Sequence, residues 1–431
     1  DRFARESVVF SNAVSNYPVC SPYRGMLMTG QWPHTNGLYR NCNSRNPDIH
    51  LSQDARCFSD VLAENGYDTG YIGKWHLDTP DPANVEYTEG PRGSGIVWDH
   101  YTPPGPRRHG FRFWHAYGCC DRHLNPHYWH NDAPVQKRVE PGEWSVEHET
   151  DVATRFLRNR DGTARDPDKP FALFLSYNPP HPPFAMVPDR YKERYENRSP
   201  DELLNRKNVR LDGKGKRAPG SVALYFSAVT GVDEQVGRIL DALDEAGLRD
   251  NTIVVFTADH GEMMGSHGRM GKPSYYDEAF RVPLIVRYPG RMTPRTDPLH
   301  MNVPDMMPTL LSLMGMRAAI PDAVQGSDHS PIFLGRENDR PTSSFYVVGE
   351  RDPDSGTRAV RTDRYTFAIE KRRAAPPVRK LFDRQEDPYQ LENVAEDREE
   401  VCERLLVELN SWLVRTNDPW KALTWRAAAT R

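Results

Sequence analysis

Three features that are scarce in this 431-residue sequence exclude broad classes of protein. Only six cysteines are present and none forms a C-x-x-C pair, so a disulfide scaffold or a zinc ribbon is not expected. The charge is nearly balanced, with 56 Lys+Arg against 60 Asp+Glu, which argues against a nucleic-acid-binding protein. No apolar run approaches the roughly 18 residues of a membrane span, so none is expected.

The sequence does contain a regular alternation of helical and strand-like segments. The strand-like segments are 8–10, 69–73, 171–177, 252–257 and 282–286, and the helical ones are 59–66, 222–243 and 306–313. This alternation predicts an α/β fold, a doubly wound and mainly parallel sheet with helices on both faces. Residues 78–145 and 185–220 lack periodicity, and we interpret them as insertions that carry substrate-recognition loops.

The pattern changes near residue 340. Short β-branched and aromatic runs at 345–348, 359–361 and 365–369 indicate antiparallel strands, and an apolar stripe from Val401 to Trp412 indicates a final amphipathic helix. We therefore predict two parts, residues 1–335 as the large α/β domain and 336–431 as a smaller α+β subdomain with an antiparallel sheet.

The segment from Cys20 to Gly30 reads CSPYRGMLMTG. Proline is tolerated in the first turn of a helix, so Pro22 places Cys20 at a helix N-terminus. Free N–H groups and the helix dipole favour an anion there. Arg24 follows one turn later, and its planar guanidinium suits a tetrahedral oxyanion.

These residues match the sulfatase signature Cys/Ser-x-Pro-x-Arg, four residues and Thr-Gly at every fixed position. The chain thus resembles the type I, formylglycine-dependent sulfatases of the alkaline phosphatase superfamily, and residues 1–335 would be their catalytic domain. The resemblance implies that a formylglycine-generating or maturase enzyme oxidises Cys20 to Cα-formylglycine, whose hydrate is the nucleophile. One hydroxyl attacks sulfur, the substrate alcohol leaves, and the other hydroxyl then eliminates sulfate.

Further motifs agree with this resemblance in type and order. Gly73-Lys74-Trp75-His76 looks like the Gly-Lys-Trp-His segment, in which Lys74 would bind a sulfate oxygen and His76 would orient the formylglycine. His181 follows a strand and would contact sulfate or protonate the leaving oxygen. Lys272 would stabilise charge on the bridging oxygen. The implied catalytic set is Cys20, Arg24, Lys74, His76, His181 and Lys272.

Asp259 and His260 follow the strand at 252–257 and resemble the metal motif of the family. The resemblance implies one Ca²⁺ ion, held by Asp259, His260 and the Cys20 position. Family members begin with a strand ending in two aspartates that are also calcium ligands, and no such segment precedes Cys20. The expectation is an N-terminally incomplete sulfatase that lacks about one βα unit and holds calcium poorly.

The implied function is removal of sulfate from a sulfated carbohydrate, such as a glycosaminoglycan. A phosphonate monoester or phosphodiester hydrolase with the same nucleophile, and a non-catalytic binder of sulfated glycans, are the alternatives. The expected partners are the sulfated saccharide and the maturase, with neither nucleic acid nor a membrane span. Family habit favours a periplasmic or secreted protein over a lysosomal one, although no leader is visible.

The first insertion is rich in rings and basic groups. One cluster of residues has three possible interpretations: a loop that stacks on sugars, ordinary packing, or a metal site. Its members are His115, His123, His127, His130, Trp114, Tyr128 and Trp129. Arg107, Arg108 and His109 suggest either a second anion site or a solvated basic turn.

Overall fold

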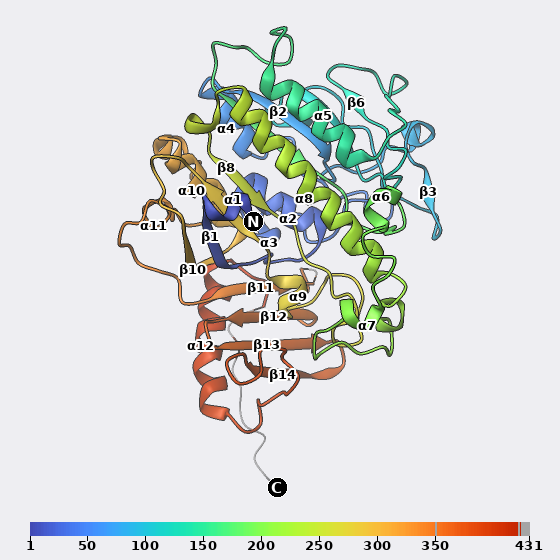
Figure 1. Cartoon of the computed structure of the whole chain (residues 1–431). Helices are drawn as coiled ribbons and strands as arrows, with labels where there is room; N and C mark the ends of the chain where they lie inside the picture. The colour runs from blue at the N-terminus through green and yellow to red at the C-terminus, as the bar shows by residue number, and fades with distance from the viewer. Residues whose placement is uncertain (350, 421–422, 424–431) are drawn as a thin grey trace.

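The computed structural model describes residues 1–349, 351–420 and 423. Two four-stranded sheets lie in its larger part (Figure 1). One has the order β10-β1-β9-β8, with β1 (Val8–Ala13), β8 (Val254–Thr257), β9 (Leu284–Arg287) and β10 (Arg295–Met301). The other has the order β6-β5-β2-β7, with β2 (Asp68–Lys74), β5 (Phe113–Tyr117), β6 (Trp129–His130) and β7 (Phe171–Ser176).

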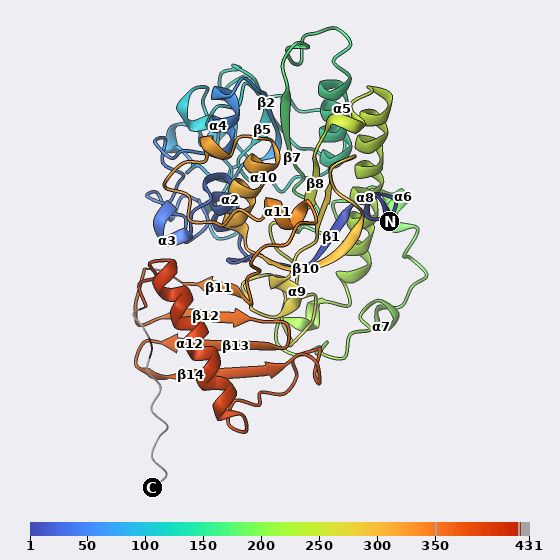
Figure 2. The same ribbon diagram turned by 90° about the vertical axis from the view of Figure 1, so that its left-hand side faces the viewer.

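Helices cover both faces of these strands, which confirms the predicted α/β class. Figure 2 shows α5 (Ser145–Arg158) and α8 (Val222–Glu245) on one side. On the other side lie α2 (Cys20–Thr29), α4 (Phe58–Glu64) and α10 (Met306–Leu313). Six shorter helices join these elements, α1 (Arg2–Arg5), α3 (Pro33–Asn36), α6 (Asp189–Lys192), α7 (Pro200–Leu203), α9 (Asp277–Phe280) and α11 (Ser330–Phe333).

The strand pairing is mixed. β2 runs parallel to β5 and β7, and β1 runs parallel to β10, whereas β9 is antiparallel to both β1 and β8. The interpretation of 78–145 purely as an insertion is wrong, because β5 lies within it and pairs with β2. The Phe-Trp-His-Ala-Tyr sequence of β5 does not alternate between apolar and polar residues, so the period of a strand was not visible.

Among the described residues, β7 pairs only with β2 and β8 pairs only with β9, so each strand has one unpaired edge. Every residue of both strands is only half-buried. Phe171, Leu173 and Val254 nevertheless pack into one cluster with Phe156 of α5 and Leu243 of α8. The two sheets therefore share a layer of helices without a common hydrogen-bonded ladder between β7 and β8.

The C-terminal part is an antiparallel sheet covered by one helix. The sheet has the order β11-β12-β13-β14, and its elements are β11 (Ser344–Val348), β12 (Gly356–Arg361), β13 (Tyr365–Arg372), β14 (Ala375–Asp383) and α12 (Glu399–Arg415). Phe345 and Trp412 stack with ring centroids 5.7 Å apart, in a core that also contains Tyr23 and Met26 of α2. This sheet thus supports the helix that carries Cys20, and the domain boundary near residue 335 stays a prediction.

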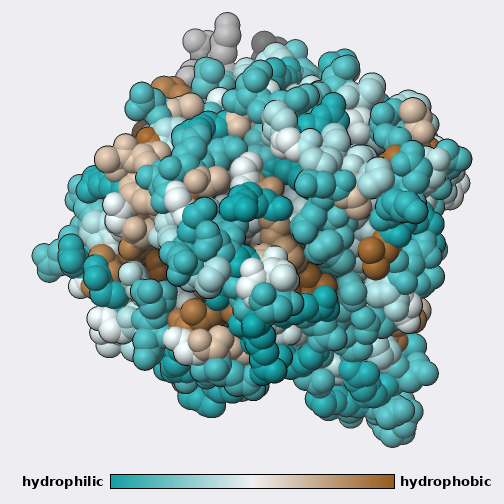
Figure 3. Space-filling model, turned by 90° about the horizontal axis from the view of Figure 1, so that it is seen from above, coloured by the Kyte–Doolittle hydropathy of each residue, from teal (hydrophilic) through white to brown (hydrophobic). Residues whose placement is uncertain are grey.

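The surface is consistent with the low mean hydropathy of the sequence. The face seen in Figure 3 is largely hydrophilic, with small and scattered apolar patches. Among the described residues, no helix has both the length and the apolar character that crossing a bilayer requires.

Glu149 is a fully buried carboxyl group on α5, next to the end of β2. Its Oε1 accepts hydrogen bonds from the hydroxyls of Tyr128 (2.9 Å) and Tyr117 (3.3 Å). Burial raises the pKa of Glu149 from 4.5 to about 8, and the two hydroxyls oppose this only in part. The folded protein therefore holds a proton here that the unfolded chain releases.

We predict that Glu149 makes the protein less stable as the pH rises from 4.5 to about 8. The folded state binds more protons in this window, so the free energy of unfolding falls by up to about 1.4 kcal/mol per pH unit. Glu149→Gln should flatten this dependence in urea unfolding at pH 5.5 and 7.5. Glu337→Gln, at an exposed position, is the control, and equal slopes for the wild type and Glu149→Gln would contradict the prediction.

Candidate functional site

Cys20 is the first residue of α2, as the position of Pro22 predicted. Its side chain is 1% exposed. The sulfur lies 3.0 Å from Nζ of Lys272, 3.6 Å from Nζ of Lys74 and 3.6 Å from Nε2 of His260. A nucleophile at this position therefore has two ammonium groups and one imidazole in direct contact.

The surroundings of Cys20 stabilise a negative charge. Burial alone raises the pKa of a thiol, but the ammonium groups of Lys272 and Lys74 outweigh it and hold the pKa of Cys20 well below its usual range. Cys20 is also the first residue of α2 and so lies at the positive end of the helix dipole. The site as a whole is thus arranged to hold an anion.

Lys74 and His76 reach the site from the end of β2. Gly73 has φ +95°, and a Cβ there would lie 2.3 Å from the carbonyl oxygen of Ser176, so this strand end requires glycine. Nζ of Lys74 also contacts Oδ1 of Asn178 at 3.0 Å. The ammonium group is thereby aimed between β2 and the loop after β7.

His76 has φ +52°, an uncommon conformation for a non-glycine residue. The hydroxyl of Ser21 donates to its carbonyl oxygen at 2.7 Å, and its Nε2 lies 3.0 Å from the carbonyl oxygen of Cys42. Burial lowers the pKa of His76, but the thiols of Cys119 and Cys20 more than offset this and raise it. The ring is therefore fixed next to the nucleophile position.

Arg24 connects the elements that surround the site. Its Nη1 donates to the carbonyl oxygen of Lys74 (2.6 Å) and to Oγ of Ser176 (2.7 Å), and its Nη2 lies 3.3 Å from Oδ2 of Asp259. Both ends of the guanidinium are thus engaged with the ends of β2, β7 and β8. Its Nε is buried and finds no hydrogen-bond acceptor among the described residues.

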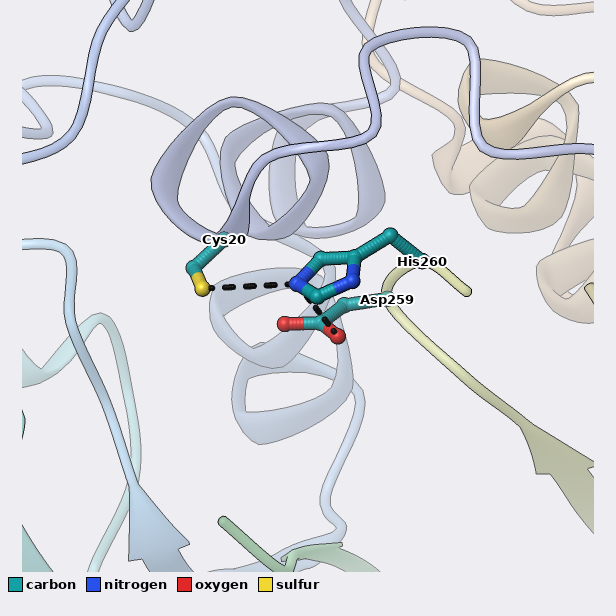
Figure 4. Close-up of side chains that lie close together, drawn as sticks. All are labelled: Cys20, Asp259 and His260. Carbon is teal, nitrogen blue, oxygen red and sulfur yellow. Dashed lines mark hydrogen bonds and ion pairs between the residues drawn. The ribbon is translucent and has the colours of Figure 1, made fainter. Parts of the chain in front are cut away.

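Asp259 and His260 follow β8 and point toward Cys20 (Figure 4). Nε2 of His260 lies 3.4 Å from Oδ1 of Asp259, and the hydroxyl of Ser15 donates to the carbonyl oxygen of Asp259 at 2.6 Å. A Cβ at Gly261 would lie 1.8 Å from the carbonyl oxygen of Glu278, so only glycine allows this turn. One ligand atom each from Cys20, Asp259 and His260 falls within 4.8 Å of the others.

His181 lies on the proline-rich loop after β7, as predicted. Its Nδ1 is 3.3 Å from Oδ1 of Asp121 and 2.7 Å from the carbonyl oxygen of Pro182. Burial, reinforced by Lys74 and Lys272, lowers the pKa of His181. The ring is therefore held by Asp121 while two cations disfavour its protonation.

The segment after β5 supplies two groups that the sequence motifs did not indicate. The thiol of Cys119 interacts with His76 and Lys74, and both lower its pKa against the effect of burial. Asp121 accepts from Nδ2 of Asn178 at 3.1 Å and also pairs with Arg92. Only their position directly after a parallel strand could have marked them, and that strand was not recognised.

The sugar-stacking interpretation of the first insertion is wrong for its rings. Trp114, Tyr128 and Trp129 are at most 1% exposed, because they form cores beneath the surface. Among the histidines of this cluster, His115, His123 and His127 are buried as well. Packing, which was one of the alternatives, accounts for these residues.

In the turn from Arg107 to His109, Arg108 and His109 are buried, so this turn is not solvated throughout. Arg108 is 3% exposed, donates to the carbonyl oxygens of Thr102 and Asn131, and lies over the ring of Trp114. Arg107 contacts Asp78 at 3.5 Å. The basic side chains of this turn therefore have partners within the protein.

Comparison with known proteins agrees with this geometry. The family model described as sulfatase matches residues 1–316, and that of the C-terminal part of N-sulphoglucosamine sulphohydrolase matches residues 265–417. An endo-4-O-sulfatase of Bacteroides thetaiotaomicron is 42% identical, over 97% of this chain and 85% of that protein. An ulvan-active sulfatase of Formosa agariphila is 34% identical, over 98% of this chain and 77% of that protein.

A solved structure from Bacteroides thetaiotaomicron, described in work on the metabolism of multiple glycosaminoglycans, superposes with a TM-score of 0.90. It is 42% identical and covers 97% of this chain and 89% of that one. Formylglycine and calcium are typical of proteins with this signature. The family model spans most of the chain, and the chain therefore belongs to the sulfatase family of the alkaline phosphatase superfamily.

Proposed function

We propose that this sulfatase removes 4-O-sulfate groups from within glycosaminoglycan chains. Hydrolysis of sulfate esters is the activity of its family. The endo-4-O-sulfatase that is 42% identical over 97% of the chain supports the choice of position, and the solved structure described in work on glycosaminoglycan metabolism supports the choice of polymer. The observation that carries the proposal is the position of Cys20, buried at the start of α2 with Lys272 and Lys74 within 3.6 Å of its sulfur.

Each residue around Cys20 has a separate role in this proposal. Lys74 and Lys272 bind the oxygens of the sulfate ester, and Lys272 stabilises charge on the oxygen that leaves. His76 orients the nucleophile. His181 delivers a proton to the leaving alcohol, and Asp121 favours that proton by opposing the effects of burial and of the two lysines on the pKa of His181. Arg24 holds the ends of the strands that carry these groups and so fixes their distances from Cys20.

Cys20 is converted to formylglycine by a maturase in this proposal. The hydrated aldehyde supplies one hydroxyl that bonds to sulfur and a second that releases sulfate, so no further nucleophile is needed. The bacterial origin of the relatives supports a periplasmic or secreted location, which cell fractionation can test.

We predict that the protein, produced together with a maturase, loses mass at Cys20 equal to SH₂ minus one oxygen atom. The modified protein should release sulfate from a 4-O-sulfated chondroitin oligosaccharide, which ion chromatography measures. Cys20→Ala should reduce the rate by roughly 10³-fold or more, because the variant has no nucleophile.

Two further substrates separate the alternatives. A phosphonate monoester and a bis-aryl phosphodiester should be turned over more slowly than the sulfated oligosaccharide, because a sulfate ester offers three non-bridging oxygens to the surrounding cations and these phosphorus esters offer two. Faster turnover of the phosphorus esters would favour the phosphonate or phosphodiester hydrolase. Binding of the oligosaccharide by fully modified protein without sulfate release would favour the non-catalytic binder.

Asp121 is a positioning residue in this proposal. It holds Nδ1 of His181 at 3.3 Å, so Asp121→Asn should lower kcat by about tenfold to a hundredfold through a misaligned acid, with a smaller effect on KM. The pH profile of kcat should also shift, which a purely structural role would not produce, and Asp121→Glu should recover part of the rate. An unchanged kcat and profile in a folded Asp121→Asn protein would contradict the assignment.

The described residues do not fit a calcium site by themselves. Calcium takes six to eight oxygen ligands, whereas Asp259 offers one carboxylate beside an imidazole and a sulfur, and Arg24 occupies part of that carboxylate. The steps proposed above therefore use only the side chains of the chain.

We predict that this chain binds calcium weakly, with a dissociation constant of about 10⁻³ M or higher by isothermal titration calorimetry. Asp259→Asn is the matched control and should abolish the residual heat. Single-site binding in the micromolar range would contradict this prediction.

A further inference from the structure

Trp98 differs from the other tryptophans that the structure describes. Seven of them are at most 5% exposed, namely Trp32, Trp75, Trp114, Trp129, Trp144, Trp412 and Trp420. Trp98 is only partly buried, and its indole N–H makes no hydrogen bond with the described residues. A partly exposed indole is unremarkable on its own, so its meaning depends on where it lies and how it is held.

Trp98 lies against the proposed catalytic centre. Its ring meets that of His76 at a centroid distance of 6.2 Å and an interplanar angle of 66°. His76 in turn interacts with the thiol of Cys20. The indole is therefore separated from the nucleophile position by one side chain, that of His76.

The backbone on both sides of Trp98 is fixed. On one side, Val97 ends β4 (Ile96–Val97), which pairs with β3 (Pro91–Arg92), and its N–H and C=O bond to Ser44 at 3.0 and 2.9 Å. On the other side, buried Asp99 accepts from the N–H of Cys119 at 3.1 Å and pairs with His127 at 2.7 Å. The backbone on both sides of the indole is thus held in place. This reduces the conformational entropy that the protein loses when a ligand binds.

The hairpin that precedes Trp98 is also connected to the proposed site through charged groups. Arg92, on the same hairpin, pairs with Glu89 and Asp121, and Asp121 contacts His181. Trp98 itself offers a flat apolar face with a hydrogen-bond donor at its edge. A pyranose ring has the complementary form, because one face exposes C–H groups and the rim carries hydroxyls.

We propose that Trp98 is the platform on which the sulfated sugar ring of the substrate stacks while its sulfate lies beside Lys74 and Lys272. This inference rests on the proposed function and concerns its specificity. The indole binds the sugar equally in the ground state and the transition state, so it governs KM for saccharides and leaves the chemical step to the residues around Cys20.

The test compares Trp98→Ala and Trp98→Phe with the wild type on a 4-O-sulfated disaccharide. Trp98→Ala should raise KM about tenfold with little change in kcat, because the apolar face of the sugar is no longer covered. Trp98→Phe keeps a flat ring and should stay within about threefold of the wild type. Unchanged KM in Trp98→Ala would overturn the inference.

Inhibition by inorganic sulfate is the internal control. Sulfate ion contacts the cations around Cys20 but carries no sugar, so its inhibition constant should be the same in Trp98→Ala and the wild type. An inhibition constant that rises as much as KM would show that Trp98 merely supports His76, and would overturn the inference.

Disaccharide binding in the Cys20→Ala background separates this inference from the proposed function. In calorimetry, adding Trp98→Ala should weaken binding about tenfold. If Trp98→Ala weakens disaccharide binding but the wild type releases no sulfate, only the proposed function is refuted. If the wild type releases sulfate but Trp98→Ala leaves disaccharide binding unchanged, only the role of Trp98 as a platform is refuted.

Discussion

The guanidinium of Arg24 is the contact on which the geometry of the site depends. It originates on α2, one turn after Cys20, and bonds to groups at the ends of β2 and β7 and to Asp259 after β8. β7 and β8 belong to different sheets and pair with different neighbours, so this buried cation is a polar connection between the sheets. The distance from Cys20 to the cation on β2 and to the metal-type motif after β8 is set by the same side chain. Reaction rates depend steeply on such distances. This explains why the guanidinium of Arg24 is hydrogen-bonded to the ends of β2 and β7 instead of pointing freely into the site.

The second constraint is electrostatic. Lys74, Lys272 and His260 all approach one sulfur atom, and Lys74 is almost fully buried. Grouping cations in a region shielded from water is unfavourable unless an anion accompanies them, and the depressed pKa of Cys20 expresses that balance. The same field that stabilises a thiolate stabilises the oxygens of a sulfate ester. The charges around Cys20 therefore indicate an anion-binding site, which is consistent with the proposed role of these residues.

The sequence was informative where the functional residues lie close together along the chain or end a regular element. The segment from Cys20 to Gly30, the pair Lys74 and His76, and Asp259 with His260 could be located because each motif begins or ends a helix or strand. Cys119 and Asp121 could not, because the pairing of β5 with β2 brings them to the site, and Trp98 could not, because its position depends on the distant contact between Val97 and Ser44. Composition does not distinguish buried aromatic rings from exposed ones, so it could not show that Trp114 and Trp129 are buried and unable to stack on a sugar. β14 was missed because it contains Pro376 and Pro377, which a strand at the edge of a sheet tolerates.

This difference between local and long-range residues also separates chemistry from specificity. An endo-4-O-sulfatase and an ulvan-active sulfatase both align with nearly the whole chain, although one is named for the position of the sulfate and the other for the glycan ulvan. The nucleophile and its cations respond to the sulfate group, which is the same in every such substrate, so they cannot by themselves select the sugar. Selection of the sugar requires side chains that lie outside the residues around Cys20, where they can contact the sugar ring that carries the sulfate and the neighbouring sugars. In the proposed function, the segment from the β3–β4 hairpin to Asp121 occupies that region, with Trp98 against His76 and Asp121 against His181. Under that proposal, changes in this segment alter the preferred sugar while the contacts around Cys20 stay the same.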